Sequence, residues 1–321
     1  MKRILLIASL SLTTLLNAQS YAPAAGVAGT TAIPGSSSQF VGWATGATVV
    51  RGPQNITNPT GPLATVGTAD DATGPANGSA IVSLGDGGSA VMTFATPIAN
   101  GPGFDFAVFE NSFSDTFLEL AFVEVSSDGI NFFRFPSHSE TQTTTQIGGF
   151  GNLDCRYINN LAGKYRANFG TPFDLSDIPN DPLLNKDRIT HVKVIDVIGT
   201  IDPVYATHDS HGNIINEPYA TPFASGGFDL DAVGVINQST LGIHDFDTTA
   251  FRMYPNPASD VVYLESDEAT TVVIYDLYGR VVKSLNKGNH NQIPVSGLAS
   301  GTYMIEVATT GRKEIKKLII R

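Results

Sequence analysis

Acidic residues stand inside several apolar segments of this sequence, where strands usually carry Val or Thr. In the segment GGFDLDAVGVI, Asp229 and Asp231 are two residues apart. In a strand both would point to one face, while Phe228, Leu230 and Ala232 would point to the other. Two carboxylates on one face repel each other unless water or a cation separates them. The spacing therefore predicts a site where these acids meet a positive partner.

Three further segments, HVKVIDVIG, FAVFENSF and ELAFVEV, place an acid in phase with apolar residues. Acid and apolar side chains would then share one face of a strand. An acid among apolar neighbours costs roughly several kcal/mol if it stays unpaired. The acids and their expected face-mates are Asp196 (Val192, Val194, Ile198), Glu110 (Phe106, Val108), Glu119 (Ala121, Val123) and Glu124 (Leu120, Phe122).

Cations are scarce around these acids, because residues 19–250 hold eight Lys and Arg against twenty-three Asp and Glu. A bound divalent cation would relieve this deficit. Oxygen ligands without a Cys or His cluster favour Ca²⁺ over Zn²⁺. The predicted Ca²⁺ ligands are Glu110, Asp196, Asp229, Asp231 and, from the loop THDSHGNIINEPY, Asp209.

Two other readings of the acids remain open. His208 and His211 would suit zinc, but no third ligand follows at a recognisable spacing. Alternatively, the acids accept hydrogen bonds from backbone N–H groups or from arginines. The candidate arginines are Arg134, Arg156, Arg166 and Arg188.

Catalytic motifs are not evident. The sequence lacks a Gly-x-Ser-x-Gly elbow, a His-Glu-x-x-His motif and a Cys–His arrangement, so an enzyme is not expected. Glu110 paired with Glu119 or Glu124 would suit glycoside hydrolysis, which is kept as an alternative. The single cysteine, Cys155, has no His nearby and reads as a passive buried residue.

Loop aromatics are the candidates for ligand binding, since exposed rings stack on sugars or flat ligands. Ordinary loop packing is the competing explanation for each of them. The strongly acidic balance excludes nucleic acid as a partner. The candidate aromatic residues are Trp43, Tyr157, Tyr205 and Tyr219.

The N-terminus reads as a secretory signal peptide over residues 1–18. Lys2 and Arg3 precede an apolar run from Ile4 to Leu16, and Ala18 offers a small residue for cleavage. No later stretch is long enough to cross a bilayer as a helix, so an integral membrane protein is not expected.

The rest of the chain predicts an all-β protein of two domains. Short apolar runs separated by Gly-, Pro-, Asn- and Thr-rich turns indicate a jelly-roll-like β-sandwich over residues 19–243, followed by a linker over 244–252. Residues 253–321 hold five or more short strands, which indicates a small immunoglobulin-like sandwich. Pro255 and Pro257 would set the entry of its first strand, and Gly279 supplies a positive φ at a turn.

The blocks YPNPASD, IYDLYGRVV, LASGTYMIEV and the basic end KEIKKLIIR occur in this order in residues 253–321. This segment resembles the type A C-terminal sorting domain of the Bacteroidetes type IX secretion system. The resemblance implies export through the Sec and type IX machineries, then release or attachment to surface lipopolysaccharide. The sorting-motif residues that it implies are Tyr254, Pro255, Asn256, Pro257, Gly279, Gly301 and Tyr303.

The blocks SLGDGGSAVMTF, DFAVFENSF, FDLSDI and SGGFDLDAVGVI of the first domain resemble an uncharacterised family of bacterial cell-surface proteins. That resemblance implies a loose association with nutrient uptake, for example of cobalamin. The sequence thus predicts a secreted or cell-surface protein whose first domain binds a glycan or a small molecule and holds Ca²⁺.

Overall fold

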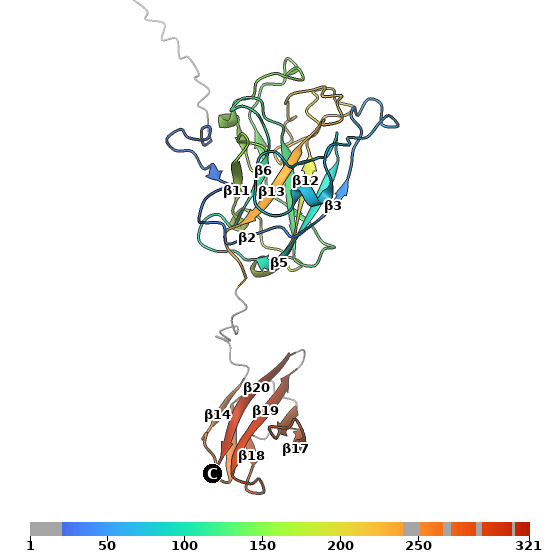
Figure 1. The fold of residues 1–321 in the computed structure, drawn as a ribbon. Helices are drawn as coiled ribbons and strands as arrows, with labels where there is room; N and C mark the ends of the chain where they lie inside the picture. Colours follow the sequence, from blue (N-terminus) through green and yellow to red (C-terminus); the bar gives the residue numbers. More distant parts are fainter. Residues whose placement is uncertain (1–20, 240–250, 266–270, 287–290, 310–311) are drawn as a thin grey trace, which may run out of the picture. The chain divides into compact units, whose positions relative to one another are not determined.

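The computed structural model describes residues 21–239, 251–265, 271–286, 291–309 and 312–321 (Figure 1). The predicted signal peptide and residues 244–250 of the predicted linker lie outside these ranges. The chain divides into two compact units, residues 1–240 and 241–321. We call their described parts the first unit and the second unit.

The first unit consists of short strands joined by long loops. Four 3₁₀ turns lie in the loops: η1 Ala69–Ala72, η2 Cys155–Tyr157, η3 Leu175–Asp177 and η4 Lys186–Arg188. The strands are β1 Ile33–Pro34, β2 Gly42–Trp43, β3 Gly46–Val50, β4 Val82–Ser83, β5 Ser89–Ile98, β6 Phe106–Glu110, β7 Ala121–Ser126, β8 Phe133–Arg134, β9 His138–Ser139, β10 Ile158–Asn159, β11 Phe169–Phe173, β12 Ile189–Asp196 and β13 Asp229–Val235.

Two antiparallel sheets face each other in this unit. One has the order β1-β11-β6-β13-β2, with β4 paired to β13, and the other has the order β3-β5-β12-β7-β8. Their inner faces share one apolar core, which includes Phe106 and Val108 of β6 and Val192 and Val194 of β12. The face assignments predicted from alternation hold for these strands, and the first unit is a β-sandwich.

A β-bulge interrupts the alternation in β13. Leu230 pairs with Glu110 and Ala232 with Phe109, so Asp231 is the extra residue between them. Leu230 and Val233 consequently lie in the inter-sheet core, while Ala232 packs on the outer side. The expectation that Ala232 shares a face with Leu230 was wrong, because the bulge changes the period.

Loops cover the outer faces of both sheets. On one side Phe40 and Trp43 pack on Phe109 and Ala232. On the other, a second apolar cluster gathers side chains from the loops on either side of β10 and from the loop after β12. The cluster comprises Leu118, Leu120, Phe122, Leu153, Cys155, Ile158, Leu161, Val197 and Ile215.

The second unit is a smaller sandwich of a three-stranded sheet, β14-β15-β18, and a four-stranded sheet, β17-β16-β19-β20. Its separate core joins the two sheets through residues such as Val262, Ile293, Ile305 and Leu318. Gly279 has φ of 78° at the turn after β16, as predicted. The strands are β14 Arg252–Tyr254, β15 Val261–Glu265, β16 Thr271–Tyr275, β17 Val281–Asn286, β18 Gln292–Pro294, β19 Gly301–Thr309 and β20 Arg312–Ile320.

Asn256 ties the start of the second unit to its last strand. Its side-chain Oδ1 accepts a hydrogen bond from Ile319 N at 2.9 Å, and its Nδ2 donates to Lys317 O at 2.8 Å. Next to it, Ala258 bridges Ile320. The asparagine between the two prolines therefore acts as a latch on β20.

The substitution Asn256→Ala is expected to destabilise the second unit by about 1 kcal/mol, because two hydrogen bonds to β20 are lost. Faster amide hydrogen exchange at Ile319 would report the loss. Asn256→Asp keeps the acceptor and should lie between the wild type and Asn256→Ala. Equal exchange rates in all three proteins would contradict the role of the latch.

Both units are therefore built from strands, which confirms the predicted all-β class. No helix among the described residues has the length and apolar character needed to cross a membrane.

Candidate functional site

Strand register brings the acids of the first unit together at one end of the sandwich. Glu110 ends β6 opposite Leu230, near the start of β13, and Asp196 ends β12 opposite Ala121, the first residue of β7. These two ends, one in each sheet, lie together, since Phe228, which directly precedes β13, donates its backbone N–H to Asp196. The resulting end cluster consists of Asp86, Glu110, Glu119, Asp196, Glu217 and Asp229, all of them buried.

Several members of the end cluster accept hydrogen bonds from backbone N–H groups. Asp196 accepts hydrogen bonds from Gly87 N at 2.8 Å and Phe228 N at 2.7 Å. Asp86 accepts from Ile56 N at 2.7 Å, and Glu217 accepts from Leu120 N at 2.5 Å. These hydrogen bonds fix loops at the end of the sandwich. They agree with the alternative prediction that the acids accept hydrogen bonds from backbone N–H groups.

Two other predicted metal ligands are engaged in the same way outside the end cluster. Asp231 accepts hydrogen bonds from the backbone N–H groups of Asn77 and Gly78. Asp209 accepts from Ser139 N at 2.8 Å and from two amides of its own loop. Their carboxylates thus stabilise loop conformations.

Glu119 and Glu110 differ from these hydrogen-bonded acids. Glu119 is 7% exposed, and its carboxyl makes no hydrogen bond or ion pair within the part of the chain that the structure describes. Glu110 Oε2 accepts from Ser112 N at 2.7 Å, but its buried Oε1 has no partner among the described residues. Buried polar atoms usually have a partner, so these two need an explanation.

A pocket of about 280 Å³ opens beside Glu119 and Asp229. Asp229 also accepts a hydrogen bond from Ser83 Oγ. The pocket has a carboxyl floor, small polar walls and an aromatic mouth. Besides the two acids, its lining residues are Asn111, Ser112, Phe113, Phe117, Gly149, Phe150, Thr221, Phe223 and Ser225.

Four phenylalanines form the mouth, which we call the phenylalanine rim: Phe113, Phe117, Phe150 and Phe223. Their ring centroids follow one another at 4.4 Å, 6.1 Å and 5.8 Å. Phe113, Phe150 and Phe223 are 71%, 72% and 46% exposed, whereas Phe117 is buried. Contiguous exposed aromatic rings commonly mark an interaction site.

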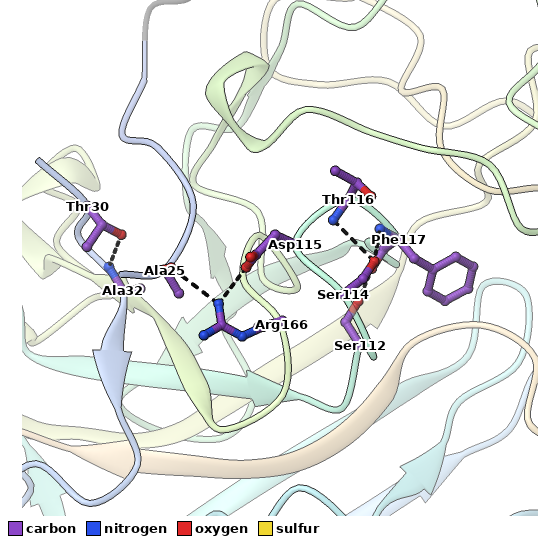
Figure 2. A network of polar contacts seen from close by, with 9 residues as sticks. All are labelled: Ala25, Thr30, Ala32, Ser112, Ser114, Asp115, Thr116, Phe117 and Arg166. Carbon is purple, nitrogen blue, oxygen red and sulfur yellow. Dashed lines mark hydrogen bonds and ion pairs between the residues drawn. The ribbon is translucent and has the colours of Figure 1, made fainter. Parts of the chain in front are cut away.

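A network of polar contacts fixes the loop between β6 and β7 that carries Phe113 and Phe117. Ser112 Oγ donates to Phe117 O, and Ser114 Oγ accepts from Phe117 N at 2.9 Å. Asp115 pairs with Arg166 at 2.7 Å, and Arg166 also donates to Ala25 O. Figure 2 shows the Phe117 ring on the side of this loop away from Arg166. The pocket wall is thus preorganised.

The substitution Ser112→Ala is expected to lower the free energy of unfolding of the first unit by about 1–2 kcal/mol, since it leaves the buried Phe117 carbonyl without its donor. Chemical unfolding followed by the fluorescence of Trp43 measures this. Ser114→Ala removes a hydroxyl from a half-buried site in the same loop and should cost less. A larger loss for Ser114→Ala would contradict the assignment.

Burial sets the protonation of the pocket acids. Burial raises the pKa of Asp229 from its ordinary value of 3.8 to about 7, against the effects of the Ser83 hydroxyl and Arg51. Burial, reinforced by neighbouring carboxyls, also raises the pKa of Glu110 and of Glu119 well above the ordinary value. Burial thus favours the protonated forms of these acids, whereas a nearby positive charge would favour their ionised forms.

The five predicted Ca²⁺ ligands fall into two groups. Glu110, Asp196 and Asp229 belong to the end cluster, Asp231 lies near enough to Glu110 to help raise its pKa, and Asp209 lies in the loop that follows β12. No group of three or more His, Cys, Asp or Glu side chains in the described ranges is arranged to hold a metal ion. Calcium binding stays a prediction.

The histidines of the zinc alternative do not converge on a third ligand. His208 is exposed, and the His211 ring lies 4.2 Å from the ring of His138, centroid to centroid. Among the candidate arginines, Arg134 pairs with Glu124 at 2.8 Å, on the outer face of β7. Glu124 is thus separated from Glu119.

The predicted aromatic candidates do not gather at the pocket. Trp43 packs on Phe40 and Phe109 at centroid distances of 4.9 Å and 5.6 Å. The Tyr219 hydroxyl donates to Asn55 Oδ1 at 3.2 Å. Tyr157 and Tyr205 are half-buried in loops, and none of these four lines the pocket.

The phenylalanine rim was missed by the sequence reasoning, which considered only Trp and Tyr. A signal was present, since the rim residues stand in the loop segments NSFSDTF, IGGFGN and TPFASGG. A Phe among Gly, Ser and Asn has no strand alternation to bury it, so its exposure could have been predicted.

Several of the predicted sorting-motif residues lie in strands β14 and β19 of the second unit or next to them. Tyr254 stacks on Tyr263 with centroids 5.6 Å apart, and the Tyr303 hydroxyl donates to Ala299 O at 2.8 Å. Gly301 is exposed at the start of β19. The peptide bonds before Pro255 and Pro257 are both cis.

Comparison with curated proteins finds no match. Among solved structures, a chain described as "Biofilm associated protein - BSP domain" matches at 10% sequence identity and a TM-score of 0.19. The match covers 73% of this chain and 48% of that one, so the chain spans about half the length of that structure. With this TM-score the match supports no statement on function.

Comparison with protein families is decisive for the second unit. Residues 252–321 match the family described as "Secretion system C-terminal sorting domain". The matched range contains β14 to β20 and the Asn256 latch. Residues 252–321 are therefore a type IX secretion C-terminal sorting domain, which directs the protein to the cell surface or the surrounding medium.

Proposed function

We propose that the first unit is an extracellular binding module that captures a small ligand in the pocket behind the phenylalanine rim. The sorting domain supports a working place outside the cell, where such a module meets its ligand. The observation that carries the proposal is Glu119, a residue more than nine-tenths buried that lines the pocket and has no hydrogen-bond or ion-pair partner among the described residues.

The physical reason lies in the cost of an unsatisfied buried polar group, about 1–3 kcal/mol and more for a charge. Glu119 accepts no hydrogen bond from the described residues to offset its burial, while Asp196 and Glu217 nearby accept backbone hydrogen bonds. A ligand that donates hydrogen bonds to the floor and packs on the rim would recover this cost. Pockets with an apolar lining and a few convergent polar groups are typical ligand sites.

The size of the pocket favours a small ligand or one substituent of a larger one. Sites for drug-sized ligands span about 300–1,000 Å³, and this pocket has about 280 Å³. A sugar ring or small metabolite fits this volume. A ligand as large as cobalamin would reach into it with a side group only.

Glycoside hydrolysis is less well supported. That chemistry needs one carboxyl protonated and its partner ionised. Here burial raises the pKa of Glu110, Glu119 and Asp229 alike, and none of the three makes an ion pair among the described residues that would keep it ionised. Glu124, the other predicted partner, is paired with Arg134 on another face. We therefore propose a binding module rather than an enzyme.

Saturation-transfer NMR on residues 19–321 tests the proposal with a panel of monosaccharides, amino acids and small amines. At least one member is expected to bind the wild type and to lose its signal in Phe150→Ala. Phe104→Ala, which changes an exposed Phe outside the pocket, is the control and should bind normally. Ligands that bind all three proteins equally would place the binding site elsewhere.

A further inference from the structure

We propose, building on the binding function above, that the pocket takes a compact organic cation, held by Glu119 and Asp229 at the floor and by the phenylalanine rim at the mouth. The shared chemistry is an ammonium group, protonated or quaternary, on a small apolar skeleton. Charge, hydrogen bonding, aromatic surface and size each contribute to this assignment.

The charge balance of the pocket calls for a positive ligand. Each member of the end cluster is an acid, and none takes part in an ion pair found among the described residues. Arg51 acts on Asp229 from a distance, but its guanidinium donates to the carbonyls of Val66, Ser83 and Gly67. That cation is committed to the backbone, so the ligand would supply the missing charge.

The hydrogen-bonding pattern calls for a donor. Within the described ranges Glu119 lines the pocket with no donor, and Asp229 has the Ser83 hydroxyl as its one side-chain partner. Hydrogen bonds in which the donor or the acceptor is ionised are about twice as strong as those between neutral groups. An N⁺–H group satisfies Glu119 directly, and a quaternary nitrogen satisfies it through charge alone.

The phenylalanine rim favours a cationic ligand that also has apolar surface. Phenylalanine has no hydrogen-bonding atom, so its ring offers the hydroxyls of a neutral sugar nothing beyond stacking. The face of an aromatic ring attracts an ammonium group, and the attraction increases when the group is desolvated. Rings set beside buried carboxyls combine both sources of attraction for one charge.

A divalent metal fits the same surroundings less well. Calcium takes six to eight oxygen ligands, but both carboxylate oxygens of Asp196 already accept backbone hydrogen bonds. The four side chains of the rim supply no oxygen. The described residues also contain no group of three acids or histidines arranged for a metal.

Isothermal titration calorimetry with isosteric pairs tests the inference on residues 19–321. Choline is compared with 3,3-dimethylbutan-1-ol, and benzylamine with benzyl alcohol, because the members of each pair differ chiefly in charge. At least one cation is expected to bind tenfold or more tightly than its neutral partner. The pair with the larger preference distinguishes a quaternary from a protonated ammonium ligand.

Two variants assign the preference to the pocket. Glu119→Gln keeps the volume but cannot ionise when a cation binds, so the preference should fall to twofold or less. Glu124→Gln, at the ion-paired acid on the outer face, should leave it unchanged. Phe150→Ala should weaken both members of the pair.

Three outcomes overturn the inference. Equal affinity within both pairs, or a preference that survives Glu119→Gln, shows that Glu119 does not recognise the positive charge of the ligand. Stabilisation by Ca²⁺ that is lost in Glu119→Gln shows a metal site instead. If neutral sugars bind and Phe150→Ala abolishes their binding, the binding function stands and the cation inference alone fails. The absence of binding by all four compounds also contradicts it.

Discussion

At pH 8 the first unit of Asp229→Asn is expected to be more stable than the wild type, by up to about 4 kcal/mol. That figure follows from the rise of the Asp229 pKa from 3.8 to about 7 on folding. Asparagine keeps an oxygen for the Ser83 hydroxyl and carries no charge to bury. Most substitutions of buried residues destabilise a protein, so a gain would identify Asp229 as a group retained for function.

The sign of this effect depends on which state binds more protons. Between about pH 4 and pH 7 the unfolded chain has released the Asp229 proton while the folded protein retains it. The contribution of Asp229 to the free energy of unfolding is fully present below pH 4 and decreases as the pH rises to 7. Asp86, whose pKa burial raises to about 6, acts in the same direction. The wild type should therefore lose stability from pH 5 to pH 8, and Asp229→Asn should lose less.

Urea unfolding at pH 5 and pH 8 measures this through Trp43, the single tryptophan, which reports on the first unit alone. Asp128→Asn is the control. Hydrogen bonds from Asn131 and Ile130 lower the pKa of Asp128, so its removal should destabilise the protein at pH 8. A wild type with equal stability at both values of pH would contradict the assigned burial of the end cluster.

Replacement of Gly163 by alanine is expected to cost about 3 kcal/mol or more. Gly163 has φ of 79°, a conformation that L-residues adopt with strain. An added Cβ would also lie 1.8 Å from the backbone oxygen of Glu119, and backbone cannot move aside as a flexible side chain does. Since this oxygen belongs to the pocket floor residue, the substitution should also weaken ligand binding.

Gly212→Ala is the matched control for Gly163→Ala. Gly212 has φ of 83°, but an added Cβ would meet no atom within 4 Å. Its cost should therefore be that of the backbone conformation alone, about 1–2 kcal/mol. Urea unfolding followed by Trp43 fluorescence compares the two variants. If they cost the same, close packing against Glu119 contributes nothing.

Much of the end cluster could be predicted from the sequence. Period-two alternation placed Glu110, Glu119 and Asp196 on the faces that carry core residues, and the structure has them there. What the sequence could not supply was register. The pairing of β6 with β13, the pairing of β12 with β7 and the packing of the two sheets on each other together bring these three acids to one end.

Local sequence also could not distinguish the roles of the acids. Asp196 and Glu119 stand in similar apolar surroundings, yet one is satisfied by two amides and the other by none among the described residues. The difference lies in loops far away in the sequence, such as the turn that presents Gly87 to Asp196. Whether a buried acid has hydrogen-bond donors around it therefore depends on the tertiary structure.

The predictions for the second unit succeeded more fully because its signals are local. Short hairpins with Gly279 at a positive φ follow from neighbouring residues. The latch of Asn256 on β20 was not predicted, since the two lie about sixty residues apart in the chain.

The latch has a consequence for the order in which the export signal becomes complete. Ala258 and Asn256 bond to β20, and β20 supplies Leu318 and Ile320 to the core of the second unit. A polypeptide emerging from the ribosome or a translocation pore N-terminus first cannot close this sandwich until residues 312–321 are free. A prematurely terminated chain would carry the tyrosine–proline motif but no finished sandwich. The folded sorting domain is thus complete only on chains that have been synthesised through to β20.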